Sequence, residues 1–260
     1  MLLALVALAA ACRTAEPPRT EAAADTIPAL PAGQFVPEYG PATPLFANFR
    51  EGLIAHRLLD TTATRLNRWL VLPEKITLAT AHCDEPNAKY EPSSRTVTLC
   101  YELFRALSER FATKTGGEYL VAGTLMFAMM HELGHALIDV LRLPTTGREE
   151  DAVDQLATLL LLRQGAAGDS LAFGAVGWFV TNAQTNRFDE IALADDHGLD
   201  QQRVYNIICW IYGRDPSRYP EVLRDGLLPE HRADRCPAEY QRLTDSWGRL
   251  LAPHERAPLQ

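Results

Sequence analysis

Apolar residues recur at helical spacing along most of this chain. Between Pro44 and Leu72 they predict one long helix, or two helices with a break, ended by Pro73. The same spacing predicts further helices, which we place at residues 101–113, 118–141, 149–164, 170–184, 201–212 and 232–251. Two short β-branched stretches, 76–80 and 95–100, indicate two strands of a hairpin joined by a turn-rich segment. The pattern therefore predicts an α+β fold that is mostly helical and has a small β-sheet.

The longest apolar stretch, residues 118–141, is long enough to raise the question of a membrane span. Polar residues interrupt it at His131, Glu132, His135 and Asp139. We therefore expect a helix buried in the core of a soluble domain.

The N-terminus has the pattern of an export signal. Residues 1–11 form an uninterrupted apolar run that is followed by Cys12. The run is too short to span a bilayer and resembles the apolar core of a secretory signal. Residues 1–12 are therefore expected to be a signal peptide, either plain or of the lipoprotein type with Cys12 as the lipidated residue. Residues 13–34, rich in Ala, Pro, Thr and Glu, are expected to be a disordered linker. This pattern predicts an exported protein, either secreted or attached to the cell envelope through its lipid.

Composition excludes one class of partner. The chain has 260 residues, a formal net charge of -8 and no run of Lys and Arg, so nucleic acid is not an expected partner. Its hydrophobic fraction of 47% is enough for a sizeable core.

Cysteine spacing agrees with an oxidising compartment. Beside Cys12 there are four cysteines, and we expect the pairs that are close in sequence to form disulfides, Cys83 with Cys100 and Cys209 with Cys236. The first pair would then join the two predicted strands. Four buried free thiols are the alternative.

The chemistry of the chain centres on His131-Glu132-Leu133-Gly134-His135. On a helix, His131 and His135 lie on one face one turn apart, which suits two ligands of one tetrahedral zinc ion. Glu132 lies about 100° around the helix, where it can take a proton from a zinc-activated water without being a ligand. Gly134 allows another element to approach closely. The alternative is a core helix with hydrogen-bonded histidines, but a core rarely needs three ionisable groups in five residues.

A third ligand is expected on the next helix. Glu150 and Asp154 are four residues apart, so Glu150 can complete the metal shell while Asp154 accepts the free N–H of a ligand histidine. Glu149 and Asp151 are alternative ligands if the helix phase differs, and acidic residues in a first turn also suit the helix dipole.

HELGH followed by a Glu-x-x-x-Asp helix resembles the gluzincin branch of the zincin metallopeptidases. More closely, the chain resembles a family of uncharacterised bacterial secreted metallopeptidases of this type. The matching stretches are NAKY at 87–90, CYEL at 100–103, HELGHALIDVLRLPTTGREEDAVDQLA at 131–157, DDHGLDQQRVYNIICWIYG at 195–213, LLPEHRADRCPAEY at 227–240 and SWGRLL at 246–251.

This resemblance implies a zincin-like fold for residues 35–260, with an N-terminal lobe (35–145) carrying the active-site helix and a helical C-terminal lobe (146–260). It implies that extended substrate adds to the strand before this helix, Arg95–Cys100, or to its neighbour. It also implies an oxyanion donor from the later lobe, for which His197 and Tyr205 are the candidates and Arg203 a third.

We therefore expect a monomeric zinc metallopeptidase with one Zn²⁺ per chain, acting on peptide or protein substrates. Two other functions are compatible with the sequence. One is an inactive, zinc-stabilised binding module of the envelope, against which the intact Glu132 argues. The other is a hydrolase of non-peptide amides or esters, which the width of the cleft would distinguish.

Overall fold

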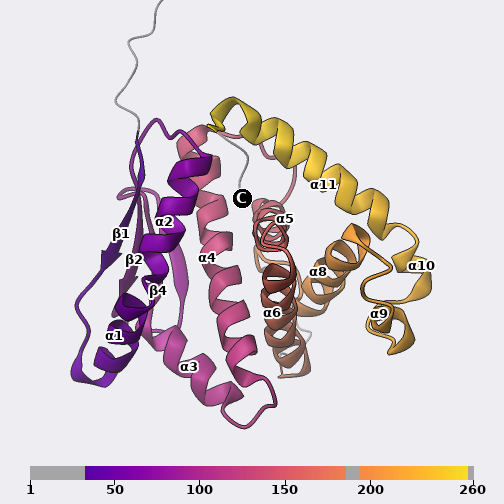
Figure 1. Ribbon diagram of the computed structural model, residues 1–260, viewed down its shortest axis with the longest axis horizontal. Coiled ribbons are helices and arrows are strands. Elements are labelled where there is room, and N and C mark those ends of the chain that lie inside the picture. Colours follow the sequence, from indigo (N-terminus) through magenta and orange to yellow (C-terminus); the bar gives the residue numbers. More distant parts are fainter. Residues whose placement is uncertain (1–32, 186–193, 257–260) are drawn as a thin grey trace, which may run out of the picture. The chain divides into compact units, whose positions relative to one another are not determined.

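A small sheet and the helices that pack against it make up the described part of the chain, residues 33–185 and 194–256 of a computed structural model (Figure 1). The strands are β1 (Phe35–Tyr39), β2 (Ile76–Ala81), β3 (Ala88–Glu91) and β4 (Thr96–Cys100). The helices are α1 (Ala47–Ala55), α2 (Leu58–Trp69), α3 (Tyr101–Phe111), α4 (Gly117–Leu141), α5 (Glu149–Leu162), α6 (Ala166–Thr185), α8 (Asp200–Arg214), α9 (Glu221–Arg224), α10 (Glu230–Ala233) and α11 (Cys236–Leu251). The architecture is the predicted α+β class.

The sheet has the strand order β1-β2-β4-β3, and only β3 runs antiparallel to its neighbour. The expected hairpin of 76–80 with 95–100 is therefore wrong, because β2 and β4 pair in parallel. The hairpin partner of β4 is β3, which lies in the segment interpreted as turns. Its sequence, Ala-Lys-Tyr-Glu, is short and has no β-branched residue, so it carries little strand signal.

Strand β1 is a second element that the apolar pattern does not predict. It contains Pro37, which is tolerated because β1 is an edge strand that pairs only with β2 within the described residues. The contacts of this segment begin before β1, since the carbonyl of Gln34 accepts from the N–H of Ile76 in β2 and the N–H of Gly33 donates to the carbonyl of Leu72. Gly33 and Gln34, the two described residues of the expected linker, are therefore hydrogen-bonded to Leu72 and Ile76. The remainder of this linker, the predicted signal and Cys12 lie outside the described residues.

Two predicted helices are each divided. The segment after Pro44 forms α1 and α2, separated at Arg57, whose φ of 51° is left-handed. This is the break that the sequence analysis allowed. The segment at 232–251 forms the short α10 and the longer α11, which begins at Cys236 and has Pro237 in its first turn.

Helix α4 is the central element of the described fold. It lies along β4 and β3, and it also packs against α5 and α6 (Figure 1). Its backbone approaches α6 closely where Gly123 meets Gly174, and a Cβ at either position would clash with backbone atoms of the other helix. Although α4 is long and apolar enough to cross a membrane, most of its apolar window is buried inside the protein. It is therefore a core helix, as its polar interruptions predict.

Both expected cysteine pairs are joined in the structure, Cys83 with Cys100 and Cys209 with Cys236. The first connects the end of β4 to the loop after β2. The second connects α8 to the start of α11.

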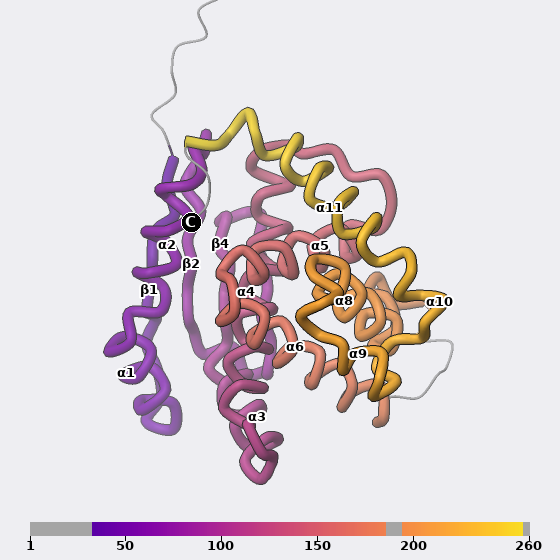
Figure 2. Tube along the Cα trace, turned by 45° about the vertical axis from the view of Figure 1, so that its right-hand side comes forward, coloured from indigo at the N-terminus to yellow at the C-terminus, as the bar shows by residue number. Residues whose placement is uncertain are grey.

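The C-terminal segment returns to the N-terminal half of the chain. Helix α11 runs from α10 past α8 and α5, and the residues after it pair with the end of α2 (Figure 2). The carbonyl of His254 accepts from the N–H of Val71, and the N–H of Arg256 donates to the carbonyl of Trp69, each at 2.7 Å. The expected N- and C-terminal lobes thus share one hydrophobic core.

Candidate metal centre

Helix α4 presents His131, Glu132 and His135 to one cavity of about 610 Å³. His131 is buried, while Glu132 and His135 are half-buried. The i, i+4 spacing places the two imidazole rings 5.0 Å apart, centre to centre. Leu133, which points the other way, is fully buried in the core, so the amphipathic pattern of α4 fixes which side faces the cavity.

Glu150, in the first turn of α5, lies between His131 and His135 and forms a cluster with them. Its Oε2 is 3.0 Å from His131 Nε2, and its Oε1 is 3.4 Å from His135 Nε2. Helix α5 can approach this closely because residue 134 is glycine, and a Cβ there would lie 2.7 Å from the side chain of Val153. The structure therefore brings together Glu150 and the two motif histidines.

The other nitrogen of each motif histidine faces a second carboxylate. His131 Nδ1 lies 2.8 Å from Asp154 Oδ1, and His135 Nδ1 lies 2.7 Å from Glu149 Oε1. Such carboxylate contacts fix the ring orientation and tautomer of a histidine whose Nε2 serves as a ligand. Asp154 stands where the i+4 spacing from Glu150 predicts it.

Asp154 is held in turn by Arg203 of α8. The guanidinium donates from Nε and Nη2 to the two carboxylate oxygens, at 2.8 and 2.7 Å. Burial raises the pKa of Asp154, but His131 and Arg203 outweigh it and hold the pKa below its usual range. Arg203 is thus the partner of Asp154, and it also lines a cavity beside His131, Glu132 and His197.

His197 joins the cluster from the segment before α8. Its Nε2 lies 3.0 Å from Glu150 Oε2, and its Nδ1 lies 3.0 Å from Asp195 Oδ1. Asp195 also accepts the backbone N–H of His197 at 2.8 Å, which fixes the turn. The structure therefore brings His197 to the site.

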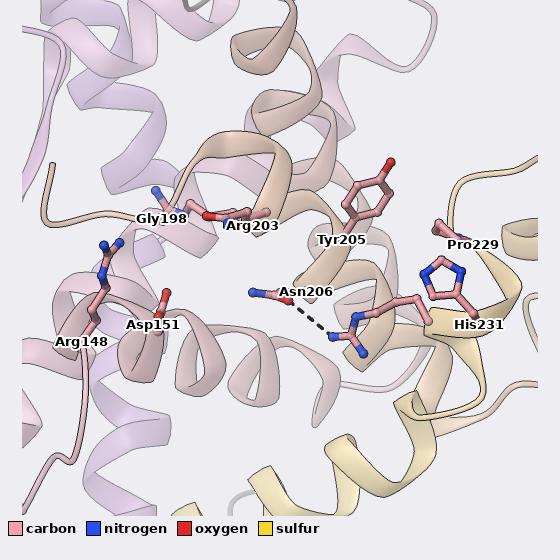
Figure 3. Close-up of a pocket in the computed structure, with 10 residues that line it drawn as sticks. Arg148, Asp151, Gly198, Arg203, Tyr205, Asn206, Pro229 and His231 are labelled. Carbon is pink, nitrogen blue, oxygen red and sulfur yellow. Dashed lines mark hydrogen bonds between the residues drawn. The ribbon is translucent and has the colours of Figure 1, made fainter. Parts of the chain in front are cut away.

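Tyr205 is not brought to the site. Residues 203 and 205 are about 200° apart around α8, so Arg203 faces the cluster and Tyr205 faces away. The Tyr205 ring is 37% exposed and lines a second cavity, on the side of Pro229 and His231 (Figure 3). The expectation that Tyr205 could stabilise an oxyanion therefore has no support in this geometry.

The ionisation of Glu132 suits proton transfer. Burial raises the pKa of its carboxyl, and the neighbouring His131 and His135 partly offset this rise. A carboxylate with a raised pKa is a better proton acceptor near neutral pH than an exposed one.

The pKa values of the three imidazoles are also raised, but by neighbouring carboxylates and against the effect of burial. Burial lowers the pKa of His135, but the carboxylates of Glu150 and Glu149 raise it to about 9. The pKa of His131 is raised by Asp154 and Glu150 in spite of burial, and that of His197 is raised chiefly by Glu150. The pKa of Glu150, which burial would raise, is held far below its usual range by the three rings. The imidazoles and carboxylates of the cluster therefore stabilise one another's charged forms.

This donor set fits a metal ion. The ligand atoms of His131, Glu150 and His197 lie within 4.8 Å of one another, and imidazole with carboxylate is a donor set that zinc favours. Glu150 Oε2 is buried and has no hydrogen-bond partner among the described residues, although two imidazole nitrogens lie 3.0 Å away. Such atoms are arranged as ligands around a common cation would be.

Comparison with protein families matches residues 40–251 to a family described as "Putative metallopeptidase". The chain belongs to this family. The match includes α4, α5 and α8, the helices that supply most of the cluster. Membership in a metallopeptidase family implies a metal ion, and His131, Glu150 and His197 could hold it. No curated protein and no solved structure matches the chain.

Three contacts of this metallopeptidase site are not anticipated by the sequence analysis. Glu149, considered only as an alternative ligand, faces His135, and Asp195 faces His197. Adjacent acids at 149–150 and the Asp-x-His spacing are the signals that could have indicated them. The third is Tyr90 of β3, whose hydroxyl donates to Asp139 Oδ2 at 2.6 Å. No sequence signal links these two residues, because they are 49 positions apart.

Proposed function

We propose that this chain is a zinc-dependent peptidase whose metal is held by His131, His135 and Glu150, with Glu132 as the general base. The observation that carries the proposal is the convergence of imidazole Nε2 atoms on Glu150, inside a cavity that Glu132 also lines. A closed structural site would have no need of a half-buried glutamate beside it.

Bound zinc would polarise a substrate carbonyl and make a water molecule acidic enough to attack it near neutral pH. The residues of the chain would transfer the proton and orient the ligands. Glu132 accepts the proton of the attacking water at its carboxylate and passes it to the leaving amine. Asp154, itself held by Arg203, orients His131, and Glu149 orients His135. His197 is placed to donate from Nε2 to the oxygen of the reacting carbonyl.

The outer edge of β3 supports a polypeptide substrate. The N–H of Cys100 donates to the carbonyl of Asn87, so residues 87 and 100 form a hydrogen-bonded pair. By the alternation of antiparallel pairs, the backbone groups of Ala88 and Tyr90 point away from β4. Both residues line the cavity of the cluster, so an extended peptide can add to this edge beside Glu132.

This edge refines the expectation about substrate binding. Strand β4 is paired on both sides, with β2 and with β3, so it has no edge for a substrate. Of the two strands suggested by the resemblance, the neighbour β3 is therefore the one that we propose. A strand edge along the cavity also favours peptides over small amides or esters, which need no such groove.

Two further proposals concern the compartment and the lipid. Two disulfides agree with an oxidising environment, so we propose that the protein is exported. The exported protein would be membrane-bound if Cys12 carries a lipid. Mass spectrometry of the mature N-terminus would distinguish lipidated Cys12 from free secretion.

The test is a comparison of the zinc-loaded chain with its Glu132→Gln variant on a peptide library. We expect zinc near one per chain in both proteins and cleavage by the wild type alone, with kcat/KM lower by at least about 100-fold in the variant, the lower end for a positioned general base. The matched control is Glu118→Gln, which changes an exposed glutamate in the first turn of the same helix, outside the cavity of the cluster. Zinc in both proteins and cleavage by neither would favour the binding module or a non-peptide substrate.

A further inference from the structure

His197 makes the same pair of contacts as the two motif histidines. In all three residues, Nε2 faces a carboxylate oxygen of Glu150 and Nδ1 faces another carboxylate. The outer carboxylates are Asp154, Glu149 and Asp195, at 2.8, 2.7 and 3.0 Å from Nδ1. This outer contact is the usual companion of a histidine that binds metal through Nε2. By its contacts, His197 is therefore equivalent to the two expected ligands.

The distances also place His197 in the ligand shell. Its Nε2 and that of His131 both lie 3.0 Å from Glu150 Oε2. Ligand atoms about 2.0–2.2 Å from a tetrahedral zinc lie roughly 3.3–3.6 Å from one another. The His197 and His131 rings are stacked, with centres 5.8 Å apart, close to the 5.0 Å between His131 and His135. The ligand atoms of His131, Glu150 and His197 already lie within 4.8 Å of one another, so these three could share an ion. His135, whose Nε2 is 3.4 Å from Glu150 Oε1, would join them through a larger movement of its side chain.

Exposure separates the three histidines. The side chains of His131 and His135 are 6% and 18% exposed, whereas that of His197 is 46% exposed. The first two lie on the core helix α4, and His197 lies in the segment just before α8. Of the three rings, that of His197 is therefore the most accessible to solvent.

We propose that His197 is the fourth ligand of the resting metal centre and that it is exchanged when substrate binds. The inference rests on the proposed function. In the resting chain the site is closed by three imidazoles and Glu150. With zinc bound, a water or substrate oxygen would replace the His197 nitrogen, so that one zinc–nitrogen bond would be exchanged for one zinc–oxygen bond. The released Nε2 would take up a proton from solvent, and the ring would stay beside the cavity through the contact of Nδ1 with Asp195, where Nε2–H would donate to the reacting carbonyl.

The number of imidazoles bound to zinc tests this directly, without any turnover. X-ray absorption at the zinc edge would be recorded for the zinc-loaded full-length chain, for His197→Ala and for His231→Ala. The last is the matched control, because His231 is exposed, lies in the second cavity and has no contact with the cluster. We expect three imidazoles in the wild type and in His231→Ala, and two in His197→Ala.

Zinc affinity gives a second readout. Competition with a chromophoric chelator should show the zinc Kd of His197→Ala at least about 100-fold above the wild type, because losing a ligand costs more than losing an outer partner. His231→Ala should match the wild type. Two imidazoles in the wild type, or an unchanged Kd in His197→Ala, would overturn the proposal. The wild-type spectrum decides even if a variant folds poorly.

The outcomes separate this proposal from the proposed function. A wild type with two imidazoles that cleaves peptides would overturn the fourth ligand and leave the peptidase. A wild type with three imidazoles that cleaves nothing would keep the fourth ligand and favour a closed binding module. A chain that takes up no zinc would contradict both.

Discussion

At the scale of a single residue, Gly134 controls the distance between α4 and α5. A Cβ at this position would lie 2.7 Å from Val153 Cγ1 and 2.8 Å from Val153 Cβ. Val153 is fully buried and β-branched, so its side chain cannot turn aside. The close approach of α5 to α4, and with it the place of Glu150, depends on the missing side chain.

Gly134→Ala should therefore lower both stability and zinc affinity. We expect the free energy of unfolding to fall by about 1–3 kcal/mol, as for other overpacked sites. Urea unfolding of the metal-free chain would measure it, and chelator competition would measure the zinc Kd. The control is Gly248→Ala on α11, where a Cβ meets nothing within 4 Å. This variant should raise the free energy of unfolding by about 0.5–1 kcal/mol. Equal behaviour of the two variants would contradict this account of Gly134.

With His135 as a zinc ligand, as proposed above, the pKa of this residue determines how zinc uptake depends on pH. In the metal-free chain its pKa is raised to about 9, so the ring is protonated at neutral pH, whereas zinc requires the neutral ring. Zinc must then displace at least one proton. We expect zinc affinity to rise by at least about tenfold per pH unit from neutral pH up to about pH 9, and proton release to be measurable in weak buffer.

Glu149→Gln is the matched variant for this prediction. It removes one of the two carboxylates that raise the pKa of His135, so the steep region should move to lower pH. An affinity that does not change with pH in the wild type would show that the rings are already neutral.

The residues of the site differ in how well the sequence predicts them. The roles of His131, Glu132 and His135 as a cluster follow from helical spacing alone, and so does the relation of Glu150 to Asp154. Arg203 and Tyr205 are different, because both were candidates and only the phase of α8 decides which of them faces the site. That phase is set by the packing of α8 against α5, α6 and α11, which the local sequence does not specify.

At the scale of elements, the disulfide between Cys209 and Cys236 joins α8 to α11. Both cysteines are fully buried, and they are separated by 27 residues. This bridge also supports the site, because α8 carries Arg203, the partner of Asp154. It therefore connects the helix at the end of the chain with the metal centre.

Replacing this pair by alanines should lower the free energy of unfolding by about 3 kcal/mol, chiefly because the unfolded chain gains freedom. Chemical unfolding under non-reducing conditions would measure the change. The matched control is the Cys83–Cys100 pair, which closes a shorter loop of 17 residues and should cost slightly less. Unchanged stability without Cys209 and Cys236 would mean that the packing of α8 on α11 alone holds this region.

Helices were predictable as elements, and strands less so. Long amphipathic segments such as α4 and α5 carry many turns of consistent spacing, so their limits follow closely from the sequence. β1 and β3 have only five and four residues and are defined by their partners. Pairing direction is a property of two strands together, which is why the expected hairpin of 76–80 with 95–100 could not be excluded from the sequence.

At the scale of the whole molecule, the last described residues form hydrogen bonds with the segment at the end of α2. Glu255 accepts a hydrogen bond from Trp69 Nε1 at 2.8 Å, beside the two backbone bonds to Val71 and Trp69. Trp69 is fully buried, so its indole N–H needs this partner. The C-terminal segment thus completes the corner between α2 and β2.

A chain ending at Leu251 should be less stable by about 2–4 kcal/mol, the sum of three hydrogen bonds of ordinary strength. Thermal and urea unfolding would measure the loss. Glu255→Ala, which removes only the side-chain bond from Trp69 Nε1, should lower the free energy of unfolding by a smaller amount. If the shortened chain were as stable as the full chain, the corner at Trp69 would have to be held by its apolar contacts alone.

If peptides add to β3 as proposed above, the length of this strand, four residues, has a consequence for which proteins can be cleaved. The strand extends over about 13 Å, so a substrate must lay down only a few residues in extended form. Those residues must have backbone groups that are not already paired within their own fold. A folded target offers such segments rarely, through local opening, and an unfolded one offers them along its whole length. The rate of cleavage would then report how often the target opens, so that the conformational stability of a client protein, more than its sequence, decides its lifetime.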